Sequence, residues 1–370
     1  MRRNVFAFLA VLLLLCGMGM ASASGEDVLR AQSEALDLEG LEDAAGDYLP
    51  DVDLEAGVGL DQGLQAILDT GSSQLFGVVR KAVRSAVLLL TVVLLCGLAE
   101  GLYAGAGTGL TADVVTVVGA LAITAIAVAD ANTLIGLGTE ALDHMAVFSK
   151  VLLPTVTAAA AAAGSPSGAV ARQLATMLFS DVLITLITRL LLPLVYAYIA
   201  ACVSYAAVGN EGLKRIAGTL KWAVTTVLTV LLLAYVGYLT VSGVVAGTAD
   251  AMAVKAAKFT VSNMVPVVGG ILSDAAETVL AGAGILKSAV GVFGMLAVLS
   301  MCLVPFLQLG VHYLAYKLTA ALAATVADGR VAGLIDGIGG AFGLILGMTG
   351  ASALLLLVSM VASVSLAAPS

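Results

Sequence analysis

The chain has 370 residues, of which 60% are hydrophobic and only 11% are charged. A mean hydropathy of +1.07 excludes an ordinary soluble domain and places the chain among integral membrane proteins. The formal net charge of −8 belongs to one region, because residues 24–79 carry almost all of the acidic excess. That region would repel nucleic acid and anionic headgroups, so we expect the lipid bilayer as an environment and no nucleic-acid partner.

The first 23 residues have the three parts of a secretory signal peptide. Arg2 and Arg3 are basic, Val5–Leu15 is apolar, and Ala21-Ser22-Ala23 is an A-x-A cleavage site. Residues 1–23 are therefore predicted to be a signal peptide cut after Ala23.

Residues 24–84 form a predicted acidic exported N-terminal segment. Leucines recur in it at helical spacing, and Pro50 interrupts the pattern. One or two short amphipathic helices are expected, and a partly disordered segment is the alternative. The leucine-type positions that carry the pattern are Leu36, Leu38, Leu41, Leu60, Leu64, Ile67 and Leu68.

Residues 85–370 are predicted to be a multi-span membrane domain, because apolar stretches of about 20 residues follow one another there. The stretch 174–208 is too long for one crossing and contains Arg189 and Pro193. Two shorter helices are favoured there, with one tilted, kinked helix as the alternative. The expected fold is an all-α polytopic membrane protein with about 7–8 transmembrane helices. The predicted spans are 86–106, 112–130, 145–163, 174–208, 221–247, 288–311 and 338–364.

Lysine and arginine positions predict the topology. Two loops hold such residues, 209–221 and 312–330, and both are expected on the cytoplasmic side. An exported N-terminus then requires an odd number of crossings before 209, which favours two helices within 174–208. The basic residues Arg80, Lys81 and Arg84 conflict with this scheme, and an interfacial helix would accommodate them.

Small-xxx-small spacing recurs in three glycine groups and allows helices to approach closely. Packing within the chain and self-association into a homo-oligomer both explain it. The groups are Gly101/Gly105/Gly109, Gly243/Gly247 and Gly339/Gly343/Gly347.

No motif of hydrolytic, redox or nucleotide-driven chemistry occurs in the sequence. The four cysteines stand singly in apolar runs and are interpreted as small buried hydrophobes. The two histidines, His144 and His312, are far from any cysteine. We therefore expect no catalytic residues, no cofactor and no metal site. Isolated intramembrane charges are expected at Asp113, Asp181 and Arg189.

The densest polar group inside the apolar half lies between residues 255 and 287. A basic pair and an acidic pair, each spaced three apart, flank "MVPVVGG", which cannot continue a helix. The prediction is helix, break, helix, as a re-entrant hairpin with paired charges, in one version pore-lining, or as an interfacial elbow with solvated charges. The candidate structural or conduction residues are Lys255, Lys258, Pro266, Gly269, Gly270, Asp274 and Glu277.

Residues 220–295 closely resemble the stage III sporulation protein AE family. The most specific runs are "DAMAVKAAKF" followed by "VPVVGGILSDA", and "LAYKLTAAL" at 314–322 also fits. One departure is "AATVADGRVAGL" after that run, where the family resemblance leads us to expect a proline.

The resemblance implies a non-enzymatic, multi-pass component of the mother-cell membrane surrounding the forespore. It would belong to a channel complex that connects the two cells and is needed for late forespore gene expression. The implied partners are other stage III A-operon proteins, including a ring-forming component and an ATPase, and a forespore membrane protein. The resemblance supplies no catalytic residues.

Two other functions remain open on the sequence. A secondary transporter would use Asp274 or Glu277 for proton exchange and the Pro-Gly-Gly break as its substrate site. A structural scaffold would only anchor soluble partners.

Overall fold

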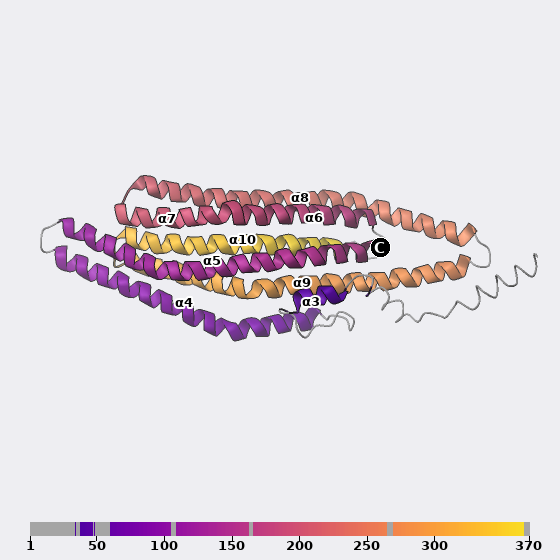
Figure 1. The fold of residues 1–370 in the computed structure, drawn as a ribbon, viewed down its shortest axis with the longest axis horizontal. Coiled ribbons are helices and arrows are strands. Elements are labelled where there is room, and N and C mark those ends of the chain that lie inside the picture. Colours follow the sequence, from indigo (N-terminus) through magenta and orange to yellow (C-terminus); the bar gives the residue numbers. More distant parts are fainter. Residues whose placement is uncertain are drawn as a thin grey trace, which may run out of the picture.

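The computed structural model describes residues 34, 38–46, 48, 60–104, 109–162, 166–264 and 269–365. Only the backbone is described for residues 60, 62, 103–104, 109–113, 160, 162, 166–174, 239–264, 269–287 and 359–365. This part of the chain is an elongated helical bundle without strands (Figure 1). The predicted all-α membrane class is confirmed. The predicted signal peptide lies outside the described residues.

The helices follow one another with short connections. Their bounds are α3 Leu38–Ala45, α4 Leu60–Ala104, α5 Gly109–Ala162, α6 Pro166–Leu186, the π-helical turn η1 Ile187–Leu191, α7 Leu192–Val208, α8 Glu211–Met264, α9 Gly269–Ala323 and α10 Gly329–Ser365.

Six helices in the described part are long and apolar enough to cross a bilayer. The expectation of seven or eight is not confirmed: two of the predicted spans lie in one helix, and the stretch 174–208 is one continuous helical run. The six candidate spans are Gly63–Leu102, Val114–Ala159, Ala175–Val208, Glu211–Tyr238, Ser288–Ala323 and Gly329–Val358.

The predicted spans 112–130 and 145–163 lie in one helix, α5, which has 54 residues. The polar residues between them do not end it, because helical hydrogen bonds are independent of side-chain hydropathy. Thr133 and Thr139 each donate their hydroxyl to the carbonyl four residues earlier, at 3.0 and 2.9 Å. Their hydroxyl groups are therefore satisfied by the helix itself.

The stretch 174–208 is likewise one helical run, so its division into two crossing helices is wrong. The backbone N–H of Leu192 donates to the carbonyl of Ile187, which is the i→i−5 bond of a π-turn. This widened turn precedes Pro193, whose ring would otherwise press on the preceding turn of an α-helix. The run adapts to its proline with a π-turn and does not break.

The two loops predicted as cytoplasmic are shorter than expected. Gly209, at φ 72°, ends α7 in the left-handed conformation, and the Asn210 side chain accepts a 2.8 Å hydrogen bond from the backbone N–H of Gly212. At the other loop, Asp328 accepts a 2.9 Å bond from the backbone N–H of Arg330 and begins α10. The turn does not require the proline that was expected there, because the Asp328 side chain caps the N-terminus of α10.

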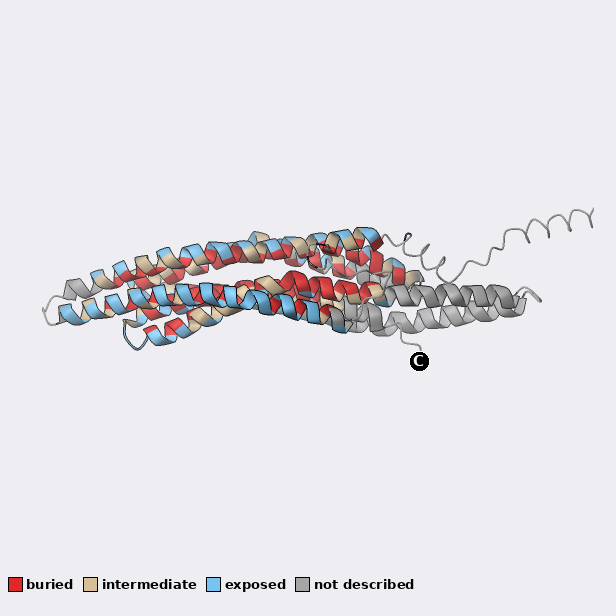
Figure 2. Cartoon of the chain, turned by 90° about the horizontal axis from the view of Figure 1, so that it is seen from below, coloured by how far each residue is buried: buried red, intermediate tan, exposed pale blue. Residues whose placement is uncertain are grey.

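Helices α9 and α10 form the centre of the bundle. Their candidate spans are 56% and 61% buried, against 17% for the span of α8. Figure 2 shows the buried residues on the inward faces of the helices and the exposed ones outside. The largest fully buried side chains in the described part include Tyr235, Tyr316, Phe148, Phe293 and Phe342.

Glycines set the close contacts of this centre. Gly339 and Gly343 of α10 face Tyr316 and Tyr313 of α9, so two members of this predicted group pack within the chain, whereas Gly347 faces open space. Gly101, in contrast, faces open space.

The acidic N-terminal segment contains helix where leucines predict it. Leu38, Leu41 and Ala45 of α3 are buried, and α3 packs against α5. The second leucine group opens α4, which continues through the predicted segment boundary at 84/85 as one helix of 45 residues.

Candidate functional site

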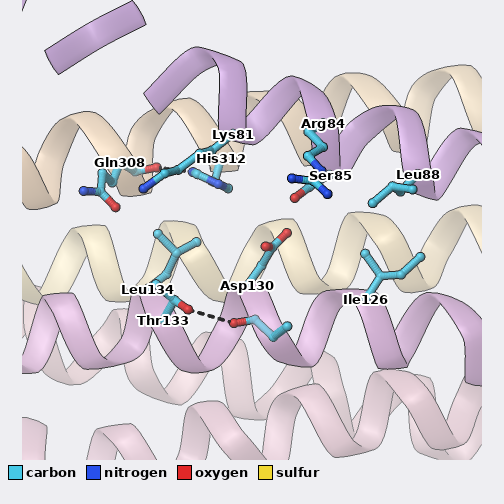
Figure 3. Close-up of a pocket in the computed structure, with 11 residues that line it drawn as sticks. Lys81, Arg84, Ser85, Leu88, Ile126, Asp130, Thr133, Leu134, Gln308 and His312 are labelled. Atoms are coloured by element: carbon cyan, nitrogen blue, oxygen red, sulfur yellow. Dashed lines mark hydrogen bonds between the residues drawn. The ribbon is translucent and has the colours of Figure 1, made fainter. Parts of the chain in front are cut away.

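A pocket of about 490 Å³ lies between α4, α5 and α9 (Figure 3). Figure 3 shows side chains of α4 and side chains of α5 pointing toward one another across it. Charged side chains between apolar helices are costly, so this cluster is a candidate functional site. The lining residues are Lys81, Arg84, Ser85, Leu88, Ile126, Ala129, Asp130, Thr133, Leu134, Gln308 and His312.

The acidic residue of the pocket is tied to the central helix. The Tyr316 hydroxyl donates a 2.7 Å hydrogen bond to Asp130 Oδ2. Tyr316 is fully buried, and its ring packs edge to face against Phe342, with the two ring centroids 4.9 Å apart. The aromatic packing fixes the hydroxyl, which in turn orients the carboxylate.

His312 is the buried histidine of the pocket, with 6% of its surface exposed. Its Nδ1 lies 2.8 Å from the carbonyl oxygen of Gln308. Because a carbonyl only accepts, Nδ1 carries the proton, and Nε2 is the nitrogen left for other contacts.

The two cations of the pocket, Lys81 and Arg84, come from α4 and lie three residues apart, so they share one helix face. Neither makes an ion pair within the described ranges. Both side chains are exposed at the pocket mouth. The basic group that conflicted with the predicted topology is therefore part of a polar site.

This pocket continues into a polar cross-section of the bundle. Lys317, next to Tyr316, pairs with Asp336 of α10 at 2.6 Å. One turn further along α10, a Cβ at Gly340 would lie 2.8 Å from the Tyr198 hydroxyl and 3.7 Å from Lys221 Nζ, so both polar groups are close to the glycine. We call this set the polar layer: Lys81, Arg84, Asp130, Tyr198, Lys221, Tyr316, Lys317 and Asp336.

The predicted break at 255–287 is only partly described. Helix α8 ends at Met264 and α9 begins at Gly269, so helix precedes and follows the break. Pro266 lies outside the described residues. The remaining candidates lie on the two helices, and the structure describes only their backbone. They are Lys255 and Lys258 on α8 and Gly269, Gly270, Asp274 and Glu277 on α9. Their pairing stays a prediction.

The other predicted polar positions are separate from the pocket. Arg189, in the π-turn, and Asp181 have exposed side chains. Asp113 is in α5, with its side chain outside the description. Cys96, Cys202 and Cys302 are free and buried, as predicted. Within the described part, no group of three or more His, Cys, Asp or Glu could hold a metal ion.

Sequence reasoning missed Asp130, Tyr316 and Gln308. Asp130 and Tyr316 are 186 residues apart, so no local spacing could join them. One signal was available: the basic residues at 80–84 were unexplained by the topology, and an acidic residue at the end of a predicted span, Asp130, stood as a possible counterpart.

Comparison with known proteins gives one consistent result. The family model described as "Stage III sporulation protein AE (spore_III_AE)" matches residues 58–367. Among curated proteins, Stage III sporulation protein AE of Bacillus subtilis (strain 168) is 27% identical over 204 residues. That alignment covers 55% of this chain and 51% of the relative, so about half of the relative's length is matched. No solved structure matches the chain.

Proposed function

Because the chain belongs to the stage III sporulation protein AE family, we propose that it is a membrane component of a sporulation channel or secretion-like complex connecting mother cell and forespore. The family match over residues 58–367, which contains the six candidate spans, carries the proposal. The family description names a sporulation protein and not an enzyme. Family membership does not favour a self-sufficient transporter.

In this proposal the chain sits as a multi-pass protein in the mother-cell membrane around the forespore. Its partners are other stage III A-operon proteins, namely a ring-forming component and an ATPase, together with a forespore membrane protein. The chain is a membrane-embedded, non-enzymatic component of this complex. The complex is needed for late forespore gene expression and for spore formation.

The architecture is suited to such a role. The central helices α9 and α10 are packed through glycine contacts along their length, which gives a rigid core. The peripheral helices α4 and α8 leave most of their surface uncovered. Uncovered apolar helix faces are available to lipid or to neighbouring membrane proteins.

The test is a clean deletion in the source organism, scored for engulfment and for a late forespore-specific transcription reporter. Normal engulfment with a silent reporter and collapsing forespores is the expected result, and a wild-type copy should restore the reporter. Normal spores after deletion would overturn the proposal. Arrest before engulfment would also overturn it, because the proposed complex is needed for late forespore gene expression and not for engulfment.

A further inference from the structure

The pocket between α4, α5 and α9 contains more positive than negative charge. Lys81 and Arg84 lack an acidic partner within 4.0 Å in the described part of the chain, and the acidic lining residue, Asp130, already accepts the Tyr316 hydroxyl. Two cations on one helix face, aimed at a pocket of about 490 Å³, form a site for an anion.

The neutral lining suits an oxygen-rich anion. Ser85 and Gln308 bring a hydroxyl and an amide group to the same pocket (Figure 3). These two groups can donate hydrogen bonds to phosphate oxygens, and arginine is adapted to bind phosphate in a bidentate manner.

The apolar lining indicates where the anion is attached. Leu88, Ile126 and Leu134 form the other part of the wall. Leu88, which lines the pocket, is 46% exposed, so the apolar wall reaches the outer surface of the bundle. A free phosphate ion gains nothing from an apolar surface, whereas an acyl chain is stabilised by contact with it.

The depth of the pocket agrees with a lipid headgroup. The pocket belongs to the polar layer, which contains Lys221, and Trp222 next to it is 66% exposed. Exposed tryptophan beside lysine is typical of the membrane–water interface. Apolar helix extends from the layer in both directions, to Leu102 on α4 and to Val358 on α10. A bilayer around either apolar zone would have one of its surfaces near the polar layer.

We propose that this pocket binds the phosphate group of an anionic phospholipid, with Lys81 and Arg84 holding the phosphate oxygens and Leu88 and Ile126 contacting the acyl chain. The inference depends on the pocket and not on the sporulation role. Its experiment uses purified protein and can fail or succeed independently of the deletion.

The experiment compares lipid retention by the full chain in detergent, measured by native mass spectrometry after exposure to phosphatidylglycerol or phosphatidylcholine. The wild-type protein should retain phosphatidylglycerol in preference to phosphatidylcholine. The variant Lys81→Gln/Arg84→Gln should lose that preference, with binding weakened about thirtyfold, while Lys81→Arg/Arg84→Lys should keep most of it. The matched control is Lys214→Gln/Arg215→Gln, two exposed cations on α8 outside the pocket, which should bind as wild type does.

Thermal unfolding of each variant shows whether it is folded, and inorganic phosphate distinguishes the source of the anion. Millimolar phosphate should displace the lipid only weakly. Equal retention of both lipids by wild type, or unchanged preference in a folded Lys81→Gln/Arg84→Gln variant, would overturn the proposal. Binding of inorganic phosphate as tight as that of the lipid would overturn the lipid as the ligand.

Discussion

Tyr316 of α9 and Asp130 of α5 are joined by a 2.7 Å hydrogen bond, although 186 residues separate them in sequence. The bond links the central helix α9 to the wall of the pocket between α4, α5 and α9. It is also a polar contact in a protein whose packing is otherwise mostly apolar, so its removal should be measurable.

We expect Tyr316→Phe to lower the free energy of unfolding by about 1–3 kcal/mol, because the half-buried carboxylate loses its donor. Chemical unfolding in detergent measures the change. Tyr313→Phe is the control, since its hydroxyl makes no hydrogen bond within the described residues and should cost little. In an Asp130→Ala background the Tyr316→Phe change should cost much less. An equal cost in both backgrounds would contradict a direct bond.

Gly97 and Gly101 lie one turn apart on α4 and should respond oppositely to alanine. A Cβ at Gly97 would lie 2.7 Å from the backbone oxygen of Val326, whereas one at Gly101 would meet nothing within 4 Å. We expect Gly97→Ala to destabilise by about 1–3 kcal/mol and Gly101→Ala to stabilise by up to about 1 kcal/mol through helix propensity. Similar unfolding curves for the two variants would show that α4 does not pack on the α9–α10 turn.

The Lys317–Asp336 pair should tolerate exchange of its charges. The two groups are 2.6 Å apart and link α9 to α10. Lys317→Asp should destabilise the protein, and the double variant Lys317→Asp/Asp336→Lys should recover about 0.2–1 kcal/mol of that loss. Glu211→Gln, which breaks an exposed pair of 3.5 Å on α8, is the control and should have a smaller effect. A double variant no more stable than Lys317→Asp would rule out the pair as a stabilising contact.

The charges on either side of the α8–α9 break provide a test in the cell. If Lys255 or Lys258 pairs with Asp274 or Glu277, Lys255→Glu should reduce spore yield and the amount of protein in the membrane. Asp274→Lys or Glu277→Lys should then restore both in part. Lys150→Glu, an exposed position on α5, serves as the comparison. Failure of both second-site changes would favour the interfacial elbow with solvated charges.

Hydropathy predicted the membrane class and most spans but not the continuity of the helices. It reports which residues prefer lipid, and the polar stretch from Asp130 to His144 therefore resembled a loop. Backbone hydrogen bonds decide continuity, and α5 keeps them through that stretch and past Pro154. The π-turn before Pro193 is invisible to hydropathy for the same reason.

The candidate site was predictable only in part. The break was predicted because Pro266 and Gly269-Gly270 act locally on the backbone. Helix α8 ends at Met264 and α9 begins at Gly269, and residues 265–268 lie outside the described residues, so the break stays a prediction. The pocket was not found, because it requires α4, α5 and α9 to meet. That meeting depends on packing of Asp130 against Tyr316 and of Gly97 against Val326, which sequence spacing cannot supply.

The unbroken length of α5 has a mechanical consequence. Its 54 residues form a rod of about 81 Å, more than twice the thickness of a hydrocarbon core. One helix therefore acts as a lever whose two arms extend from Asp130 in opposite directions. A tilt of about 5° around that point would move an arm of about 45 Å by about 4 Å at its end. A force applied to the bundle on one side of the polar layer would thus reach the other side through one continuous helix.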